Sequence, residues 1–130
     1  MQVVMVAFDG FTDIDLFVPW DLLNRVQDPF LNELRLDPSR QMIAGIDSGV
    51  LLLAKLGLLE GLSATTYPSV FPELEAMGIR TEHRAVVIHG NVATGGGCLA
   101  TQDLAAWIVE GLIGHAAARA VLDSVAKVGS

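Results

Sequence analysis

The chain has 130 residues, 52% of them apolar, and its 8 basic and 15 acidic residues give a net charge of −7. This apolar content excludes a disordered chain, and the length fits one domain that buries a core. Because Lys and Arg do not cluster, the sequence also excludes a surface that binds nucleic acid or an anionic membrane.

The cysteine and histidine content argues against a metal centre. Cys98 is the single cysteine, which excludes an internal disulfide and a cysteine-rich zinc site. The histidines His83, His89 and His115 lie far apart in the sequence and match no ligand spacing. We therefore expect neither a metal ion nor another cofactor.

The sequence shows no targeting or membrane signal. Its N-terminus has no basic lead-in and no small-residue cleavage site, so we expect no signal peptide. Uninterrupted apolar runs such as residues 50–54 are far shorter than the roughly 18 residues that suggest a transmembrane helix. We expect a cytoplasmic protein with no membrane partner.

The first half of the chain predicts strands that alternate with helices. Residues 2–8 form a nearly continuous apolar run, which is typical of a strand buried on both faces. We expect a helix over residues 14–26 and a short one over 30–37. A second buried strand (41–46), a sharp turn (47–49) and an apolar helix (50–59) follow.

The second half continues this alternation. The expected elements are a short strand (64–67), a helix (69–77) stopped by Gly78, two extended runs joined by a hairpin at 89–91, a helix from Thr101 to Gly114, and a last helix over 115–127. Strands that alternate with helices predict an α/β domain with a mostly parallel sheet.

The segment Asp47-Ser48-Gly49 stands where an apolar strand runs directly into an apolar helix. This pattern is typical of a nucleophile elbow, in which a sharp turn raises one side chain above the sheet. A glycine such as Gly49 would allow a close backbone approach there. An aspartate before a helix is also a common N-cap, so the residues alone leave both interpretations of Asp47 open.

Three blocks of sequence resemble the DJ-1/PfpI family. They are AFDGFTDIDLFVPWDLL near the N-terminus, GIDSGVLLLAKLGLLEGLSATTY around the turn, and VVIHGNVATGGG followed by DLAAWIVEGLIG. The match is closest to the isonitrile hydratase-like branch and covers nearly the whole chain. The resemblance implies a flavodoxin-like sandwich, similar to class I glutamine amidotransferases, around a mostly parallel sheet.

The resemblance also implies a set of site residues. Asp15 matches the acid beside the nucleophile, Asp47 occupies the nucleophile position, and Ser48 is the hydroxyl residue after it. We expect these three to be the catalytic residues, with the carboxylates of Asp15 and Asp47 close together. Tyr67 falls where some family members carry a histidine, and with Gly49 it is expected to contact the substrate.

Two departures from the family pattern bear on function. The active enzymes of the family carry a cysteine where this chain has Asp47, and a carboxylate is a much weaker nucleophile toward carbon than a thiolate. Relatives also have more chain between the first helix and the elbow. This difference predicts a deletion or an unseen gap near residues 27–29, within one domain over 1–130.

The resemblance therefore implies a protein similar to isonitrile hydratase, which hydrates an isonitrile to an N-substituted formamide, with this activity impaired or lost. The alternative is a catalytically silent module of the same fold that binds a small molecule or a protein. The partner that we expect is a small-molecule substrate or ligand, and the resemblance implies a homodimer.

Three further features carry weaker signals. Cys98 is expected to be a small buried side chain rather than a reactive thiol. The glycines at 95–97 lack the lysine and spacing of a P-loop, and the resemblance implies that they pack closely near the elbow. His89 is expected to be solvated at the tip of the hairpin.

Overall fold

The computed structural model describes residues 36–126 and residue 129. The predicted strand over 2–8, the helix over 14–26, most of the short helix over 30–37 and the break expected near 27–29 lie outside these residues. Within the described part of the chain, no helix is long and apolar enough to cross a membrane.

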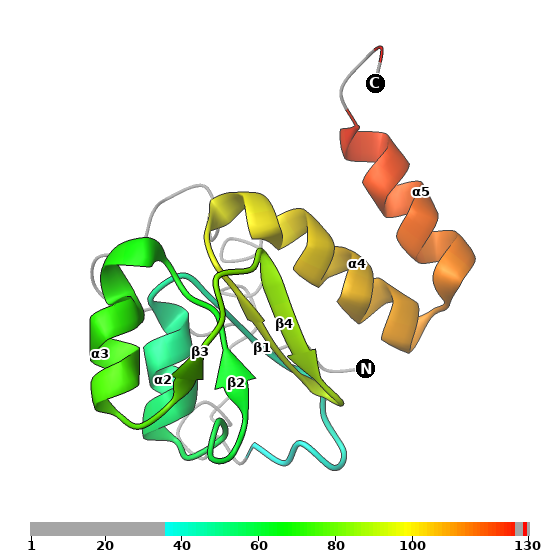
Figure 1. Ribbon diagram of the computed structural model, residues 1–130. Helices are drawn as coiled ribbons and strands as arrows, with labels where there is room; N and C mark the ends of the chain where they lie inside the picture. Colours follow the sequence, from blue (N-terminus) through cyan, green and yellow to red (C-terminus); the bar gives the residue numbers. More distant parts are fainter. Residues whose placement is uncertain (1–35, 127–128, 130) are drawn as a thin grey trace, which may run out of the picture. The chain divides into compact units, whose positions relative to one another are not determined.

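The larger sheet of the described part contains β1 (Ile43–Ile46), β5 (Val92–Gly95) and β4 (Val86–His89), in the order β1-β5-β4 (Figure 1). β1 runs parallel to β5, whereas β4 and β5 form an antiparallel hairpin through Gly90 and Asn91. Gly90 has φ 57, a left-handed conformation that glycine adopts without steric cost. The hairpin predicted at 89–91 is thereby confirmed.

A smaller sheet pairs β2 (Ser63–Ala64) with β3 (Arg80–Thr81) in parallel. The α/β fold is confirmed, with a larger sheet that is mixed and a smaller one that is parallel. The strand predicted over 64–67 is wrong beyond its first residue. The Thr65 N–H donates to the side-chain hydroxyl of Thr94 in β5, at 3.0 Å, instead of to a backbone carbonyl of a sheet ladder.

Helices cover both faces of the larger sheet (Figure 1). On one face, an added Cβ at Gly45 would come within 2.8 Å of a side chain of α2 (Gly49–Lys55). On the other face, an added Cβ at Gly95 would come within 2.7 Å of a side chain of α4 (Thr101–Leu112). Gly95 pairs with Ile46, the residue after Gly45, and successive strand residues point to opposite faces. The sheet is thus sandwiched between α2 and α4.

The helix after the elbow ends earlier than the apolar run over 50–59 predicts. It ends at Lys55, because Gly57 adopts a left-handed conformation with φ 75. The N–H groups of Gly57 and of the next residue donate to carbonyls of the last helical turn, each at 3.0 Å, as in a Schellman motif. The apolar residues that follow form turns, in which Leu59 is buried without being helical.

The remaining helices follow the predictions closely. The 3₁₀ turn η3 (Pro68–Val70) leads into α3 (Phe71–Ala76), which ends before Gly78 at φ 82. α5 (His115–Val125) follows Gly114 and packs against α4. Glycine at both stops explains why these two boundaries are visible in the sequence.

Candidate functional site

Asp47 sits at the turn between β1 and α2. Its φ is 55, and among the described residues it is the one non-glycine residue with a positive φ. This left-handed conformation is uncommon for residues that carry a side chain, although aspartate tolerates it better than most. A strained residue between a strand and a helix is the geometry of a nucleophile elbow. The sharp turn predicted from D-S-G is therefore present.

Four hydrogen bonds hold this conformation, one of them from the Val50 N–H to the Asp47 carbonyl at 3.3 Å. The Asp47 N–H donates to the Gly95 carbonyl of β5 at 3.0 Å, and Thr66 Oγ1 donates to the Asp47 carbonyl at 2.7 Å. The Ser48 N–H donates to Asp47 Oδ1 at 2.7 Å, so the carboxylate satisfies a backbone donor at the start of α2. Asp47 thus stands at the elbow and also supports the first helical turn.

The strap after β2, residues 65–67, connects the elbow to its surroundings through buried threonines. Thr65 and Thr66 are each 1% exposed. Thr66 bonds to the elbow, and Thr65 Oγ1 donates to the Arg84 carbonyl at 2.7 Å. Buried hydroxyls are stable only when they are bonded, so these two restrict where the strap can lie. This role was not predicted from the sequence. The signal that could have indicated it is the pair of neighbouring threonines after an apolar segment.

The glycines at 95–97 pack closely beside the elbow, as predicted. An added Cβ at Gly96 would lie 3.0 Å from the Arg84 carbonyl oxygen and 3.1 Å from Thr65 Oγ1. The close approach expected at Gly49 is wrong, because an added Cβ there would meet none of the described residues within 4 Å. The contact of Gly49 with substrate is a separate expectation and stays a prediction.

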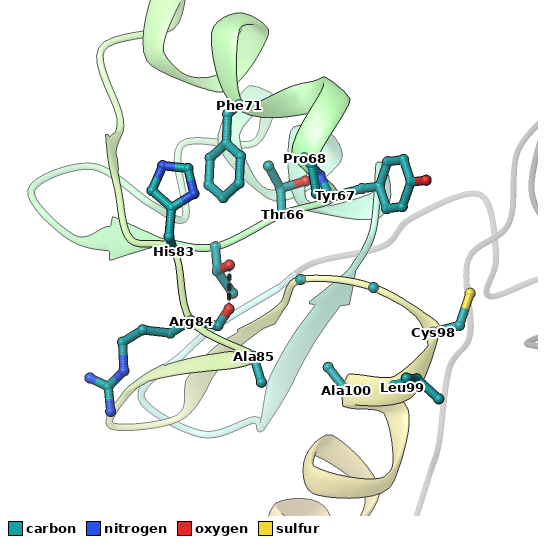
Figure 2. A pocket seen from close by; sticks show the side chains of 13 residues that line it. Thr66, Tyr67, Pro68, Phe71, His83, Arg84, Ala85, Cys98, Leu99 and Ala100 are labelled. Atoms are coloured by element: carbon teal, nitrogen blue, oxygen red, sulfur yellow. Dashed lines mark hydrogen bonds between the residues drawn. The ribbon is translucent and has the colours of Figure 1, made fainter.

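A hollow of about 590 Å³ opens on the strap (Figure 2). It lies between the strap, the start of α3, the loop before β4 and the loop before α4, and such a volume is typical of small-molecule pockets. Its lining residues are Thr65, Thr66, Tyr67, Pro68, Phe71, His83, Arg84, Ala85, Gly96, Gly97, Cys98, Leu99 and Ala100.

Aromatic rings and a thiol border this hollow. The rings of Phe71 and His83 lie against each other, with centroids 4.3 Å apart, and form one wall. Tyr67, predicted to contact the substrate, lines the hollow and is 48% exposed. Cys98 is exposed, so the prediction of a buried side chain is wrong. It begins the 3₁₀ turn η4 (Cys98–Ala100), in which Ala100 is the buried residue.

A second polar cluster lies where β2 begins and β4 ends. Ser63 Oγ donates to Glu82 Oε1 at 2.5 Å and lies 3.0 Å from His89 Nε2. The hydroxyl has a single proton, which it gives to Glu82, so the imidazole is the donor in the second bond. His89 is therefore half-buried and bonded, and the expectation that it is solvated is wrong.

The electrostatics of this cluster centre on Glu82. The Ser63 hydroxyl, and after it the positive charge of Arg84, lower the pKa of the Glu82 carboxyl. Serine stands between the acid and the imidazole, whereas in a nucleophilic triad the histidine stands between them. The cluster is thus a structural link between β2 and β4. Among the described residues, no three His, Cys, Asp or Glu side chains gather as a metal site requires.

The predicted catalytic residues are only partly brought together by the described structure. Asp47 and Ser48 are adjacent at the elbow, and Tyr67 follows the threonine that bonds to Asp47. Asp15 lies outside the described residues, so its closeness to Asp47 stays a prediction.

The fold and the elbow are those of a known class of protein. Residues 35–111, more than half of the chain, match the model of the DJ-1/PfpI family, and the chain belongs to this family. This match confirms the family that the sequence resembles and, with the mixed sheet between helices, its flavodoxin-like α/β fold.

Individual relatives agree with this assignment. Protein DJ-1alpha from Drosophila melanogaster is 35% identical over 80 residues, which make up 62% of this chain and 37% of that protein. A THiJ/PfpI family protein from Pseudomonas syringae is 30% identical, with a TM-score of 0.57 over 67% of this chain and 39% of its own. DJ-1 from Schizosaccharomyces pombe, 24% identical, shares the fold with a TM-score of 0.61 over 78% of this chain and 54% of its own. The chain thus spans 37–54% of the length of these relatives.

Proposed function

We propose that the elbow and the adjoining hollow form a small-molecule site of the isonitrile hydratase-like kind, with Asp47 at the nucleophile position. The observation that carries the proposal is the left-handed conformation of Asp47, φ 55, at a strand-to-helix turn in a DJ-1/PfpI protein. Strained backbone of this kind persists only where neighbouring bonds hold it, and it concentrates at functional sites.

In the chain as it stands, the thiol-dependent reaction is impaired or lost. Hydration of an isonitrile adds one water molecule at the terminal carbon and yields an N-substituted formamide. The resemblance implies a thiolate as the nucleophile for this step, and a carboxylate replaces it poorly. The Asp47 carboxylate also accepts the Ser48 N–H at 2.7 Å, so one of its oxygens is already engaged within the protein. In this proposal Asp15 is the general acid and base, and Gly49 and Tyr67 contact the ligand.

The experiment restores the thiol. Asp47→Cys is prepared in a Cys98→Ser background, so that the elbow carries the single thiol of the chain. We expect iodoacetamide to alkylate this thiol with a pH midpoint below the ordinary cysteine value of about 8.5, because the Ser48 N–H faces the elbow side chain. We also expect this variant to convert an alkyl isonitrile to the formamide. The reaction is measured as the loss of the isonitrile stretching band in the infrared spectrum.

The controls separate the elbow from the natural cysteine. The unaltered chain and Cys98→Ser alone are expected to show no turnover. Turnover by the unaltered chain that disappears in Cys98→Ser would contradict the proposal, since the reaction would then depend on Cys98. If the thiol in Asp47→Cys has an ordinary pKa and the variant shows no turnover, the hydratase-like activity in the proposal is contradicted. The site would then keep only a ligand-binding role.

A further inference from the structure

We infer that the hollow beside the elbow binds the neutral, apolar body of a small molecule, such as an aromatic ring or a branched alkyl group. The inference rests on the proposed function and deepens it by naming the class of ligand. The substituent of the reacting molecule would occupy the hollow, and its reactive end would lie toward Asp47.

The polar atoms of the strap are already used within the protein. Thr65 Oγ1 and Thr66 Oγ1 each donate at 2.7 Å to a backbone carbonyl, of Arg84 and of Asp47. The Gly96 N–H on the facing loop donates to the Ala85 carbonyl at 2.9 Å. Apart from the Tyr67 hydroxyl, the His83 imidazole, the Arg84 side chain and the Cys98 thiol, the side chains of the lining offer methyl groups, rings and other carbon atoms, which take up apolar groups from water.

The charges around the hollow favour a neutral occupant. Among the residues that the structure describes, no carboxylate lines it. Arg84 belongs to the lining, but its guanidinium points away from the hollow in Figure 2 and lies 3.6 Å from a Glu82 carboxylate oxygen. A charged group held inside would lose water without gaining a partner, and such desolvation is unfavourable.

The walls of the hollow suit a ring or a bulky alkyl group. Phe71 is 8% exposed, so it is anchored in the core and presents a fixed ring beside His83. Aromatic rings stack on such a surface with a gain beyond simple burial. Gly97 also lines the hollow, and an added Cβ there would lie 3.8 Å from the Tyr67 ring. The absence of a side chain at Gly97 keeps this part of the hollow open.

The hollow and the elbow are continuous through a single residue. Thr66 lines the hollow, and its hydroxyl bonds to the carbonyl of Asp47. A molecule held in the hollow therefore contacts the strap that supports the elbow. This continuity distinguishes the hollow from an unrelated depression in the surface.

Cys98 offers a built-in reporter for this site. It lines the hollow, is exposed, and is the single cysteine of the chain. Its alkylation rate with iodoacetamide therefore reports on this location alone. The probe is N-phenyl-1-naphthylamine, a neutral aromatic molecule whose fluorescence rises in apolar surroundings.

We expect the probe to bind the unaltered chain and to protect Cys98. At ten times the dissociation constant, alkylation should slow about ten-fold, because only the unoccupied fraction of sites reacts. The related anion 8-anilinonaphthalene-1-sulfonate adds a sulfonate to the same body. We expect it to bind about five-fold more weakly, because the lining provides no partner for the charge.

Matched variants locate the binding. Ala85→Trp places an indole in the lining and should abolish both the fluorescence rise and the protection of Cys98. Ala116→Trp, at an exposed alanine of α5 outside the lining, should leave both unchanged. His83→Ala removes an exposed ring of the lining and should weaken probe binding several-fold. This second variant keeps the test decisive if the indole in Ala85→Trp disturbs folding.

Several results would overturn the inference. They are absence of probe binding, binding that leaves Cys98 unprotected, equal losses in Ala85→Trp and Ala116→Trp, and equal or tighter binding of the sulfonate. Probe binding that falls as the protein concentration rises, together with a larger particle in light scattering, would show that a second copy covers the hollow and would also overturn it. Asp47 is intact in every arm. Absence of turnover in the Asp47→Cys variant, with probe binding to the unaltered chain retained, would contradict the proposed function alone.

Discussion

Thr66 is one of the residues that hold the conformation of the elbow, and it does so through its side chain. It is 1% exposed, and its hydroxyl donates to the carbonyl of Asp47 at 2.7 Å. The carbonyl belongs to the residue with φ 55, so the bond restrains a backbone that would otherwise relax toward negative φ. Thr65 makes a bond of the same length to the Arg84 carbonyl and does not touch the elbow through its hydroxyl.

Thr66→Val keeps the shape of the side chain and removes the donor. We expect a loss of about 1 kcal/mol in the free energy of unfolding, measured with urea, because the Asp47 carbonyl loses the shorter of its two hydrogen bonds and keeps only that from the Val50 N–H at 3.3 Å. In the Asp47→Cys, Cys98→Ser background, the same change should also slow alkylation of the elbow thiol.

Thr65→Val is the matched control for this prediction. It should lower the stability by a similar amount but leave the alkylation rate unchanged, and Thr66→Ser should restore the rate because it keeps the hydroxyl. Equal alkylation rates in Thr66→Val and Thr65→Val would mean that the Thr66 bond has no special effect on the elbow.

Glu82 makes the stability of the fold depend on pH in the acid range. The Ser63 hydroxyl and the charge of Arg84 lower its pKa in the folded chain. A carboxyl with a lowered pKa stabilises the fold above its unfolded pKa, and this stabilisation is lost as the pH falls through the folded pKa.

We therefore expect Glu82→Gln to lower the urea midpoint at about pH 7, and the difference from the unaltered chain to shrink between about pH 5 and pH 3. Glu60→Gln, at an exposed glutamate outside the cluster of Ser63, Glu82 and His89, is the control. It should change the urea midpoint little at either end of this pH range. A difference that stays constant over this range would show that the carboxylate charge does not stabilise the cluster.

At the scale of the elements, α2 illustrates how a single glycine ends a helix within an apolar run. The residues on both sides of Gly57 are apolar, yet the chain turns there with φ 75. The turn brings Leu59 into the core at 1% exposure and leads the chain toward β2 and the strap. The position of the strap relative to the elbow thus follows from this helix end.

Gly57→Ala and Gly49→Ala should change the stability in opposite directions. A Cβ at Gly57 is strained at positive φ, so we expect a loss of about 1 kcal/mol or more in the free energy of unfolding. Gly49 is helical, and a Cβ there meets none of the described residues within 4 Å, so alanine should add up to about 0.5 kcal/mol. Urea unfolding of both variants checks this, and changes of the same sign would contradict it.

At the scale of the whole molecule, we expect a homodimer. The family resemblance implies this state, and 52% of the residues are apolar in a chain of 13.8 kDa. Apolar side chains at the end of α4 are open to solvent, with Leu112 48% and Ile113 70% exposed, and a second copy could cover them. Multi-angle light scattering at micromolar concentration should give twice the chain mass. A single-chain mass would refute the prediction.

The difference in length from the relatives also belongs to this scale. The chain spans 37% of DJ-1alpha and 54% of DJ-1 from Schizosaccharomyces pombe. The deletion or gap expected near residues 27–29 would account for part of this difference. It stays a prediction, because those residues lie outside the described part of the chain.

The sequence by itself was enough for the family, the alternation of strands and helices, the hairpin and the turn at Asp47. Each of these depends on residues that are neighbours in the chain: Gly90 and Asn91 in the hairpin, Gly78 after α3, and the passage from an apolar strand through D-S-G into an apolar helix. Local elements of this kind can be predicted from the sequence because backbone conformation and side-chain periodicity are set within a few residues.

Only the tertiary structure decided which distant residues complete the site. The bond from Thr66 to Asp47 joins residues 19 positions apart, and the contact of Ser63 with His89 joins residues 26 apart. The hollow likewise combines the strap with the loop that contains Gly96 and Cys98. No local pattern encodes such pairings, because they arise when the strands align and buried polar groups must find a partner wherever the packing brings one within reach.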